Sequence, residues 1–131
     1  MKDTMIWMID DDPIYQIIMK KNIYRSGLFS SYNSFSNGEE AINSLKEIIR
    51  NNSILPDIIL LDIEMPVLDG WGFMNEIISL KSQINKEIKI YIASSSIAIE
   101  DKERAQNNPN VIGYISKPIS QEDLKKIIGS E

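Results

Sequence analysis

Short apolar runs alternate with amphipathic stretches along the whole chain. Two continuous apolar runs, Met5 to Ile9 and Ile58 to Leu61, each end at an aspartate. Uninterrupted apolar runs of this length are typical of parallel strands that are buried on both faces. The other predicted strands are Ser31 to Phe35, which is polar enough for a sheet edge, Ile88 to Ala93, and Val111 to Ile115.

The stretches between these runs place apolar residues at helical spacing. Asp12 followed by Pro13 is typical of a helix cap and first turn, and Ile14, Ile17 and Ile18 predict the inner face of the helix that follows. Four further helices are predicted. Three of them have inner faces formed by Ala41, Ile42, Leu45, Ile48 and Ile49, by Phe73, Met74, Ile77 and Ile78, and by Leu124, Ile127 and Ile128. The fourth is a polar helix over Ala98 to Asn107.

Five strands alternating with five helices predict an α/β fold with a parallel sheet covered on both faces. Asn37 and Gly38 are expected to form a turn after the second strand. The length of 131 residues suits a single domain, residues 1–131, with no separate output domain. Trp7, Trp71 and Phe73 are expected to pack in or near its core.

The composition is that of an ordinary soluble protein, with 43% apolar and 25% charged residues. A formal net charge of -5 offers no electrostatic footprint for nucleic acid or an anionic membrane, so direct binding to either is not expected. No apolar stretch approaches the length that spans a bilayer. We therefore expect a cytoplasmic protein.

Cysteine and histidine are both absent. Their absence excludes disulfides, thiol nucleophiles, Ser-His-Asp triads and metal sites built on thiolate or imidazole. Any metal must be held by oxygen ligands, which favours Mg²⁺, Mn²⁺ or Ca²⁺.

Polar side chains follow four of the predicted strands. Asp10 and Asp11 follow the first, Asp62 follows the third, Ser94 follows the fourth, and Lys117 comes shortly after the fifth. Ligands of open parallel sheets bind beyond the carboxyl ends of the strands, so these groups are expected to converge on one rim. Crowded carboxylates repel unless a cation neutralises them, and oxygen ligands alone suit Mg²⁺.

This combination is suited to phosphoryl transfer. A carboxylate can attack phosphorus as a nucleophile, while a divalent cation and an ammonium hold the charge of the transferring oxygens. A serine hydroxyl can then donate a hydrogen bond to the product phosphate.

The segment Asp57 to Gly70, with the sequence DIILLDIEMPVLDG, resembles the phosphoacceptor segment of response regulator receiver domains. The segments Ile9 to Pro13 (IDDDP) and Gly113 to Pro118 (GYISKP) resemble the other two motifs of that family, and the resemblance covers the whole chain in order. It implies a CheY-like, flavodoxin-like doubly wound fold with strand order 2-1-3-4-5.

The resemblance also implies roles at the acidic end of the rim. Asp62 would be the phosphoacceptor, and Asp11 would bind Mg²⁺ directly. Asp10 would support the metal, through water, and the backbone carbonyl of Glu64 would supply a further ligand. Glu64 also places an acidic side chain near the pocket, at a position where the family tunes the lifetime of the phosphate.

Further roles follow for the other strands. Lys117 would contact the phosphoryl group, and its peptide bond to Pro118 is expected to be cis. Ser94 would be the hydroxyl that turns toward the phosphate, with Ser95 as the alternative because three serines are consecutive. Tyr114 would be the aromatic partner whose rotamer follows the serine.

The expected function is that of a phosphorelay receiver. A phosphohistidine on a sensor histidine kinase or histidine phosphotransfer protein would donate to Asp62, because this chain has no histidine. The domain would catalyse only its own phosphorylation and dephosphorylation. It would be a monomer or weak dimer, and its output would be contact with another protein. Ile97, Ala98 and Ile99, at the start of the fourth helix, are candidate contacts for an output protein.

Two other classes remain open. A phosphohydrolase of the haloacid-dehalogenase type also uses Asp, Mg²⁺ and Lys, but that family has a second Asp two residues after its nucleophile, where this chain has Glu64. The other alternative is a pseudo-receiver, a binding module with this fold that is not phosphorylated. The complete acidic pocket and Lys117 argue against it.

Overall fold

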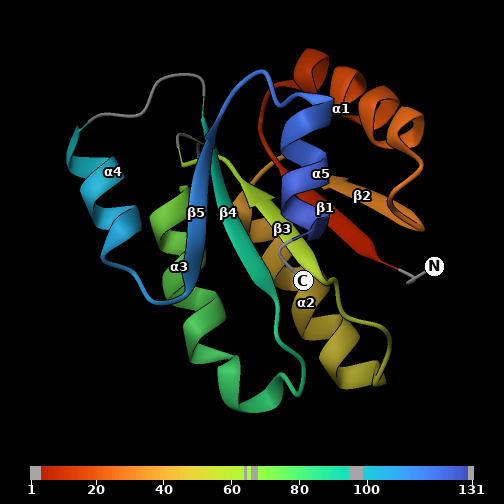
Figure 1. Cartoon of the computed structure of the whole chain (residues 1–131). Helices are drawn as coiled ribbons and strands as arrows, with labels where there is room; N and C mark the ends of the chain where they lie inside the picture. The colour runs from red at the N-terminus through yellow and green to blue at the C-terminus, as the bar shows by residue number, and fades with distance from the viewer. Residues whose placement is uncertain (1–3, 64, 66–67, 95–98, 130–131) are drawn as a thin grey trace.

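The computed structural model describes residues 4–63, 65, 68–94 and 99–129. Strands and helices alternate along the chain, as the hydrophobic pattern predicts (Figure 1). In chain order the elements are β1 (Met5–Ile9), α1 (Pro13–Ser26), β2 (Ser31–Phe35), α2 (Gly38–Asn51), β3 (Ile58–Leu61), α3 (Gly70–Ser79), a short 3-10 helix (Lys81–Gln83), β4 (Lys89–Ser94), α4 (Ile99–Gln106), β5 (Val111–Ser116) and α5 (Gln121–Gly129).

The five strands form one parallel sheet in the order β2-β1-β3-β4-β5, which confirms the flavodoxin-like prediction. The central strand β3 is buried at all four positions, as its uninterrupted apolar sequence predicts. The edge strand β2 is half-buried or exposed throughout, which agrees with its polar sequence. Parallel pairing places the carboxyl ends of all five strands at the same rim of the sheet.

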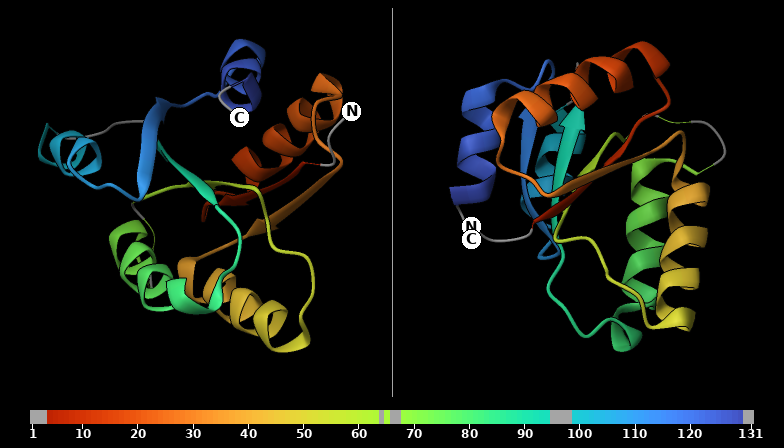
Figure 2. Two further views of the ribbon diagram at one scale, coloured as in Figure 1. Left: turned by 60° about the horizontal axis from the view of Figure 1, so that its bottom comes forward. Right: turned by 90° about the vertical axis from the view of Figure 1, so that its right-hand side faces the viewer.

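Helices cover both faces of the sheet, as Figure 2 shows in its right-hand view. One core cluster joins β1, β3 and β4 to α1 and α5, and includes Tyr15, Met19 and Leu124. The other cluster lies on the opposite face, where α2 and α3 pack and Ala105 of α4 contributes. This second cluster also holds Trp7, Trp71 and Phe73, which are 1%, 8% and 0% exposed, so their predicted core positions are confirmed.

The inner face predicted for the first helix is wrong. Ile14, Ile17 and Ile18 are 69%, 58% and 45% exposed, whereas Tyr15 and Met19 are buried against the sheet. The α1 sequence carries apolar side chains on more than one side, so spacing alone does not choose the buried side. Packing against β1 and β3 makes that choice.

The turn expected at Asn37 and Gly38 is the start of a helix. The Asn37 side chain accepts a hydrogen bond from the backbone N–H of Glu40 at 2.9 Å, so Asn37 caps α2 and Gly38 is its first residue. A Cβ at Gly38 would lie 2.9 Å from the carbonyl oxygen of Leu68, a second reason for glycine there. In the part of the chain that the structure describes, no helix has the length and apolarity needed to cross a membrane.

Candidate functional site

The polar residues predicted to converge do meet at the carboxyl rim of the sheet. Asp10 and Asp62 directly follow the neighbouring strands β1 and β3, and Ser94 is the last residue of β4. Asp10, Asp62 and Ser94 are 1%, 6% and 6% exposed, which makes them three of the few buried polar residues among those described. Burying carboxylates costs free energy unless something compensates them.

Asp10, Asp11 and Asp62 bring their carboxylates together. Each offers one oxygen such that all three oxygens lie within 4.8 Å of one another, with Asp11 exposed and the other two buried. A set of carboxylate oxygens without imidazole or thiolate suits a hard divalent cation such as Mg²⁺. The residues present therefore fit the metal that the sequence predicts. Glu64, whose carbonyl was predicted as a further ligand, lies outside the described residues.

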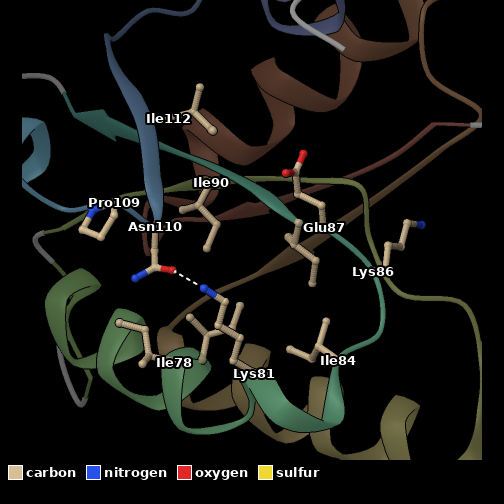
Figure 3. A pocket seen from close by; sticks show the side chains of 11 residues that line it. Ile78, Lys81, Ile84, Lys86, Glu87, Ile90, Pro109, Asn110 and Ile112 are labelled. Atoms are coloured by element: carbon tan, nitrogen blue, oxygen red, sulfur yellow. Dashed lines mark hydrogen bonds between the residues drawn. The ribbon is translucent and has the colours of Figure 1, made fainter.

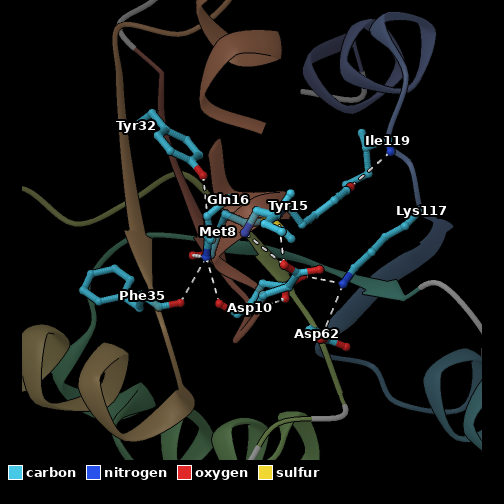
Figure 4. A network of polar contacts seen from close by, with 11 residues as sticks. Met8, Asp10, Tyr15, Gln16, Tyr32, Phe35, Asp62, Lys117 and Ile119 are labelled. Carbon is cyan, nitrogen blue, oxygen red and sulfur yellow. Dashed lines mark hydrogen bonds and ion pairs between the residues drawn. The ribbon is translucent and has the colours of Figure 1, made fainter. Parts of the chain in front are cut away.

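Lys117 reaches into this acidic cluster from the end of β5 (Figure 4). Its ammonium donates to Asp10 in a short contact and lies 3.5 Å from Asp62 Oδ2, with the lysine side chain 12% exposed. Burial would lower the pKa of Lys117, but the hydrogen bond to Asp10 and the charges of Asp10 and Asp62 outweigh it and raise that pKa. Lys117 thus stays charged at neutral pH, and its one ammonium contacts two of the three clustered carboxylates.

The predicted cis peptide bond between Lys117 and Pro118 is present. The backbone N–H of Lys117 donates to the carbonyl of Ser94 at 2.9 Å, so the ends of β4 and β5 are joined at the rim. Ser94 therefore lies at the site as predicted. Its alternative, Ser95, falls outside the described residues.

Tyr114 lies in β5, opposite Ile92 of β4 and two residues before the position that pairs with Ser94. Because side chains alternate along a strand, Tyr114 and Ser94 share the face of the sheet that α3 and α4 cover. The Tyr114 ring is half-buried, and the ammonium of Lys102 on α4 lies 5.0 Å from its centroid. The switch role that the resemblance implies for Tyr114 remains a prediction.

Gln16 orders the turn that carries the acidic residues, and the sequence did not single it out. Its amide nitrogen lies 3.0 Å from the carbonyl oxygen of Asp10 and 3.2 Å from that of Phe35, so it ties the end of β1 to the end of β2 (Figure 4). Tyr32 donates its hydroxyl to Gln16 Oε1 at 2.7 Å. Burial raises the pKa of Tyr32 far above its usual value, so the phenol remains a donor.

Tyr15 is the other site residue that sequence reasoning missed. Its hydroxyl accepts the backbone N–H of Ile119 at 3.1 Å, and its ring centroid lies 4.7 Å from the Lys117 ammonium. Both partners are more than 100 positions away in the sequence. A helical aromatic carries no local signal that could have indicated such contacts.

Gly70 sets the path of the chain after Asp62. A Cβ at this position would lie 2.6 Å from the Cα of Ile63 and 2.8 Å from the carbonyl oxygen of Asp62, so no larger residue fits without a shift of backbone. Asp69 caps α3 by accepting from Gly72 N at 2.8 Å. The Asp69-Gly70 pair thus starts α3 against the backbone of Asp62 and Ile63.

The opposite end of the sheet is different in character. A hollow of about 330 Å³ lies at the amino ends of β4 and β5, where isoleucines form most of its wall (Figure 3). Lys81 donates to Asn110 across its edge at 3.0 Å. None of the predicted site residues lines it.

Comparison with known proteins gives a family match. The family model of the response regulator receiver domain matches residues 6–129. The probable methanogenesis regulatory protein FilR2 of Methanothrix harundinacea is 26% identical over 124 residues, which are 95% of this chain and 78% of that protein. The sensor histidine kinase CheAY of Helicobacter pylori is 29% identical over 126 residues, 96% of this chain but 15% of the kinase. The chain therefore spans most of one relative and a small part of the other.

Solved structures show the same fold. A two-component response regulator from Cytophaga hutchinsonii has a TM-score of 0.83 at 27% identity, with all of both chains covered. The receiver domain of the sensor histidine kinase PA1611 from Pseudomonas aeruginosa, with magnesium in its active site cleft, has a TM-score of 0.76 at 21% identity, covering 98% of this chain and 97% of that one. The receiver domain of Ssk1 from Saccharomyces cerevisiae, crystallised with the histidine phosphotransfer protein Ypd1, has a TM-score of 0.77 at 24% identity, covering 96% and 86%.

Proposed function

The chain belongs to the family of response regulator receiver domains, and we propose that it is a phosphorylation switch whose acceptor is Asp62. One observation carries the proposal. The carboxylates of Asp10, Asp11 and Asp62 cluster at one rim with the ammonium of Lys117 in contact with two of them. Such a cluster is poised to bind a group that carries both a divalent cation and phosphoryl oxygens.

The proposed reaction is transfer from a phosphohistidine on a partner protein. A carboxylate oxygen of Asp62 forms a bond to phosphorus while the bond from phosphorus to the imidazole nitrogen breaks. The electron pair of that bond stays on the imidazole, which takes up a proton. Lys117 would follow the charge onto the phosphoryl oxygens, since its ammonium already lies 3.5 Å from Asp62. The domain itself would turn over no other substrate.

Asp10, Asp11 and Asp62 are the described residues that would hold Mg²⁺. When bound, the cation would offset the charge of these carboxylates and of the phosphoryl oxygens. Asp10 also accepts the backbone N–H of Asp12 at 2.9 Å, so its carboxylate is held in orientation by its own turn. The magnesium in the active site cleft of the PA1611 receiver supports this part of the proposal.

Residues at the ends of β4 and β5 would then respond to the phosphoryl group on Asp62. Ser94, buried at the end of β4, would donate its hydroxyl to the phosphate, and Tyr114 on the same face would change rotamer with it. The ammonium of Lys102 contacts the ring of Tyr114, so a rotation of the ring alters the contact between β5 and α4. An output protein would bind this altered surface.

The donor protein would dock beside the rim on α1. Ile14, Ile17 and Ile18 are exposed on this helix, which begins directly after the acidic turn. Exposed apolar side chains grouped on one helix are typical of protein contacts. The complex of the Ssk1 receiver with the histidine phosphotransfer protein Ypd1 supports a histidine phosphotransfer protein as the kind of partner.

The experiment that tests the proposal measures intact mass after incubation with acetyl phosphate and Mg²⁺. We expect the wild type to gain one phosphoryl group and Asp62→Asn to gain none, because the amide is not a nucleophile for phosphorus. EDTA should abolish the gain in the wild type. Asp57→Asn is the matched control, since Asp57 lies at the amino end of β3, at the opposite end of the sheet from Asp62.

Either of two results would contradict the proposal. Labelling of Asp62→Asn at the wild-type level would place the acceptor elsewhere. No labelling of the wild type, under conditions that label another receiver domain, would instead favour the pseudo-receiver.

A further inference from the structure

Tyr15 makes two contacts at the rim at once. It is the third residue of α1, and its backbone N–H donates to the capping carboxylate of Asp12 at 3.2 Å. The same turn carries Asp10 and Asp11, so the backbone of Tyr15 is fixed relative to the acidic cluster. Its side chain is 8% exposed and points away from solvent.

The ring of Tyr15 contacts the ammonium of Lys117. The nitrogen lies 4.7 Å from the ring centroid, within the range in which the negative face of an aromatic ring attracts a cation. Lys117 is a long, flexible side chain that has to keep its ammonium near Asp62. Two carboxylates and one aromatic face together restrict that ammonium.

The hydroxyl of Tyr15 holds the backbone of the same segment. It accepts the N–H of Ile119, two residues after Lys117, at 3.1 Å, and Ile119 is 1% exposed (Figure 4). A buried N–H needs an acceptor, so this bond fixes the loop between β5 and α5 against α1. The side chain of Tyr15 thus orients both the backbone next to Lys117 and the Lys117 ammonium.

We infer that Tyr15 is a positioning residue, whose ring holds the Lys117 ammonium where it meets the phosphoryl group. The inference rests on the proposed function for its effect on rate, but the contact itself can be tested without phosphorylation. A purely structural role for Tyr15, as one more side chain packed between α1 and the sheet, predicts neither a ring-dependent rate of phosphorylation nor a ring-dependent chemical shift of Lys117.

Three variants separate the ring from the hydroxyl and from packing. Tyr15→Phe keeps the ring and removes the acceptor of Ile119, whereas Tyr15→Leu removes both. Tyr24→Leu is the control, because Tyr24 lies on the same helix but is 65% exposed. Tyr15→Met replaces the leucine variant if circular dichroism shows that the latter does not fold.

The first measurement is the rate of phosphoryl gain from acetyl phosphate at saturating Mg²⁺. We expect Tyr15→Leu to be about five-fold slower, the rate equivalent of one cation–aromatic contact, and Tyr15→Phe to stay within about two-fold of wild type. Affinity for Mn²⁺, measured by electron paramagnetic resonance, should not change in either. Equal slowing in both variants would assign the effect to the hydroxyl and overturn the role of the ring.

The second measurement is the chemical shift of the Lys117 side chain by NMR of ¹³C-lysine protein, assigned with Lys117→Met. Protons over an aromatic face are shifted upfield, so the Lys117 methylene next to the ammonium should be upfield in wild type and Tyr15→Phe and normal in Tyr15→Leu. An unshifted wild-type resonance would refute the contact. Failure of wild type to label would refute the proposed function while this measurement still decides the position of Lys117.

Discussion

The two ends of the sheet use the same residue types for different purposes. At the amino end, Asp57 pairs with Lys86 at 2.7 Å and accepts the backbone N–H of Met5 at 2.8 Å, so one carboxylate meets one ammonium and one amide. At the carboxyl rim, three carboxylates cluster and the ammonium of Lys117 contacts two of them. In a matched pair the two charges neutralise each other within the chain, whereas an excess of negative charge favours binding of a cation.

The charged side chains at the two ends of the sheet also differ in burial. The side chains of Lys86 and Asp57 are 34% and 21% exposed, so water screens their attraction and their pairing adds little. Asp10 and Asp62 are 1% and 6% exposed, where charge is costly and a ligand that offsets it binds strongly. The rim therefore keeps a destabilising arrangement that the other end of the sheet avoids.

The largest effect is expected on the rate of transfer from a histidine donor, when a charge is placed on α1 and compared with a charge at the amino end of the sheet. Ile17 on α1 and Ile112 at the amino end of β5 are 58% and 53% exposed, so they form a matched pair. We expect Ile17→Asp to slow transfer from a histidine donor at least about ten-fold, because a carboxylate would be buried in the interface. Ile112→Asp should transfer normally. The donor is the kinase or phosphotransfer protein that labels wild type fastest in a panel.

Acetyl phosphate provides the control for this pair. Both variants should accept its phosphoryl group at the wild-type rate, since neither isoleucine lines the acidic cluster. Equal loss of histidine-dependent transfer in both variants, or in neither, would refute docking on α1.

An intermediate effect is expected from Mg²⁺ on thermal stability. A ligand that binds only the folded state, at a free concentration of about ten times its Kd, adds about 1.4 kcal/mol, which raises the Tm by about 5 °C. Asp11→Asn should reduce this shift, because Asp11 supplies one of the clustered oxygens. Differential scanning calorimetry with Mg²⁺ and then EDTA measures it. A shift that survives in Asp11→Asn but disappears in Asp57→Asn would move the metal site to the other end of the sheet.

The smallest effect is expected at the amino end. Asp57→Asn should lower the free energy of unfolding by about 1 kcal/mol, because it weakens the bond to Met5 N and removes a partly screened ion pair. Urea denaturation measures this loss. Phosphoryl gain from acetyl phosphate should be unaffected, and a reduced gain would show that the two ends of the sheet are coupled.

Much of the site follows from where apolar runs stop. Asp10 and Asp62 directly follow the two most apolar strands, and parallel strands place such residues at one rim whatever the details of packing. Ser94 and Lys117 were found in the same way. The strand order itself came from the resemblance, because apolar runs of similar composition do not indicate which strands are neighbours.

The sequence by itself determined the alternation of strands and helices and the acidic rim, since these depend on local spacing and on chain direction. The choice of Asp62 as candidate acceptor came from the resemblance to receiver domains. Only the tertiary structure decided which side of α1 is buried, because that helix is apolar on more than one side and packing against β1 and β3 selects Tyr15 over Ile14. The same choice turned Tyr15 toward Lys117 and Ile119, 102 and 104 positions away. Contacts over such separations depend on how the elements pack, and no local pattern contains that information.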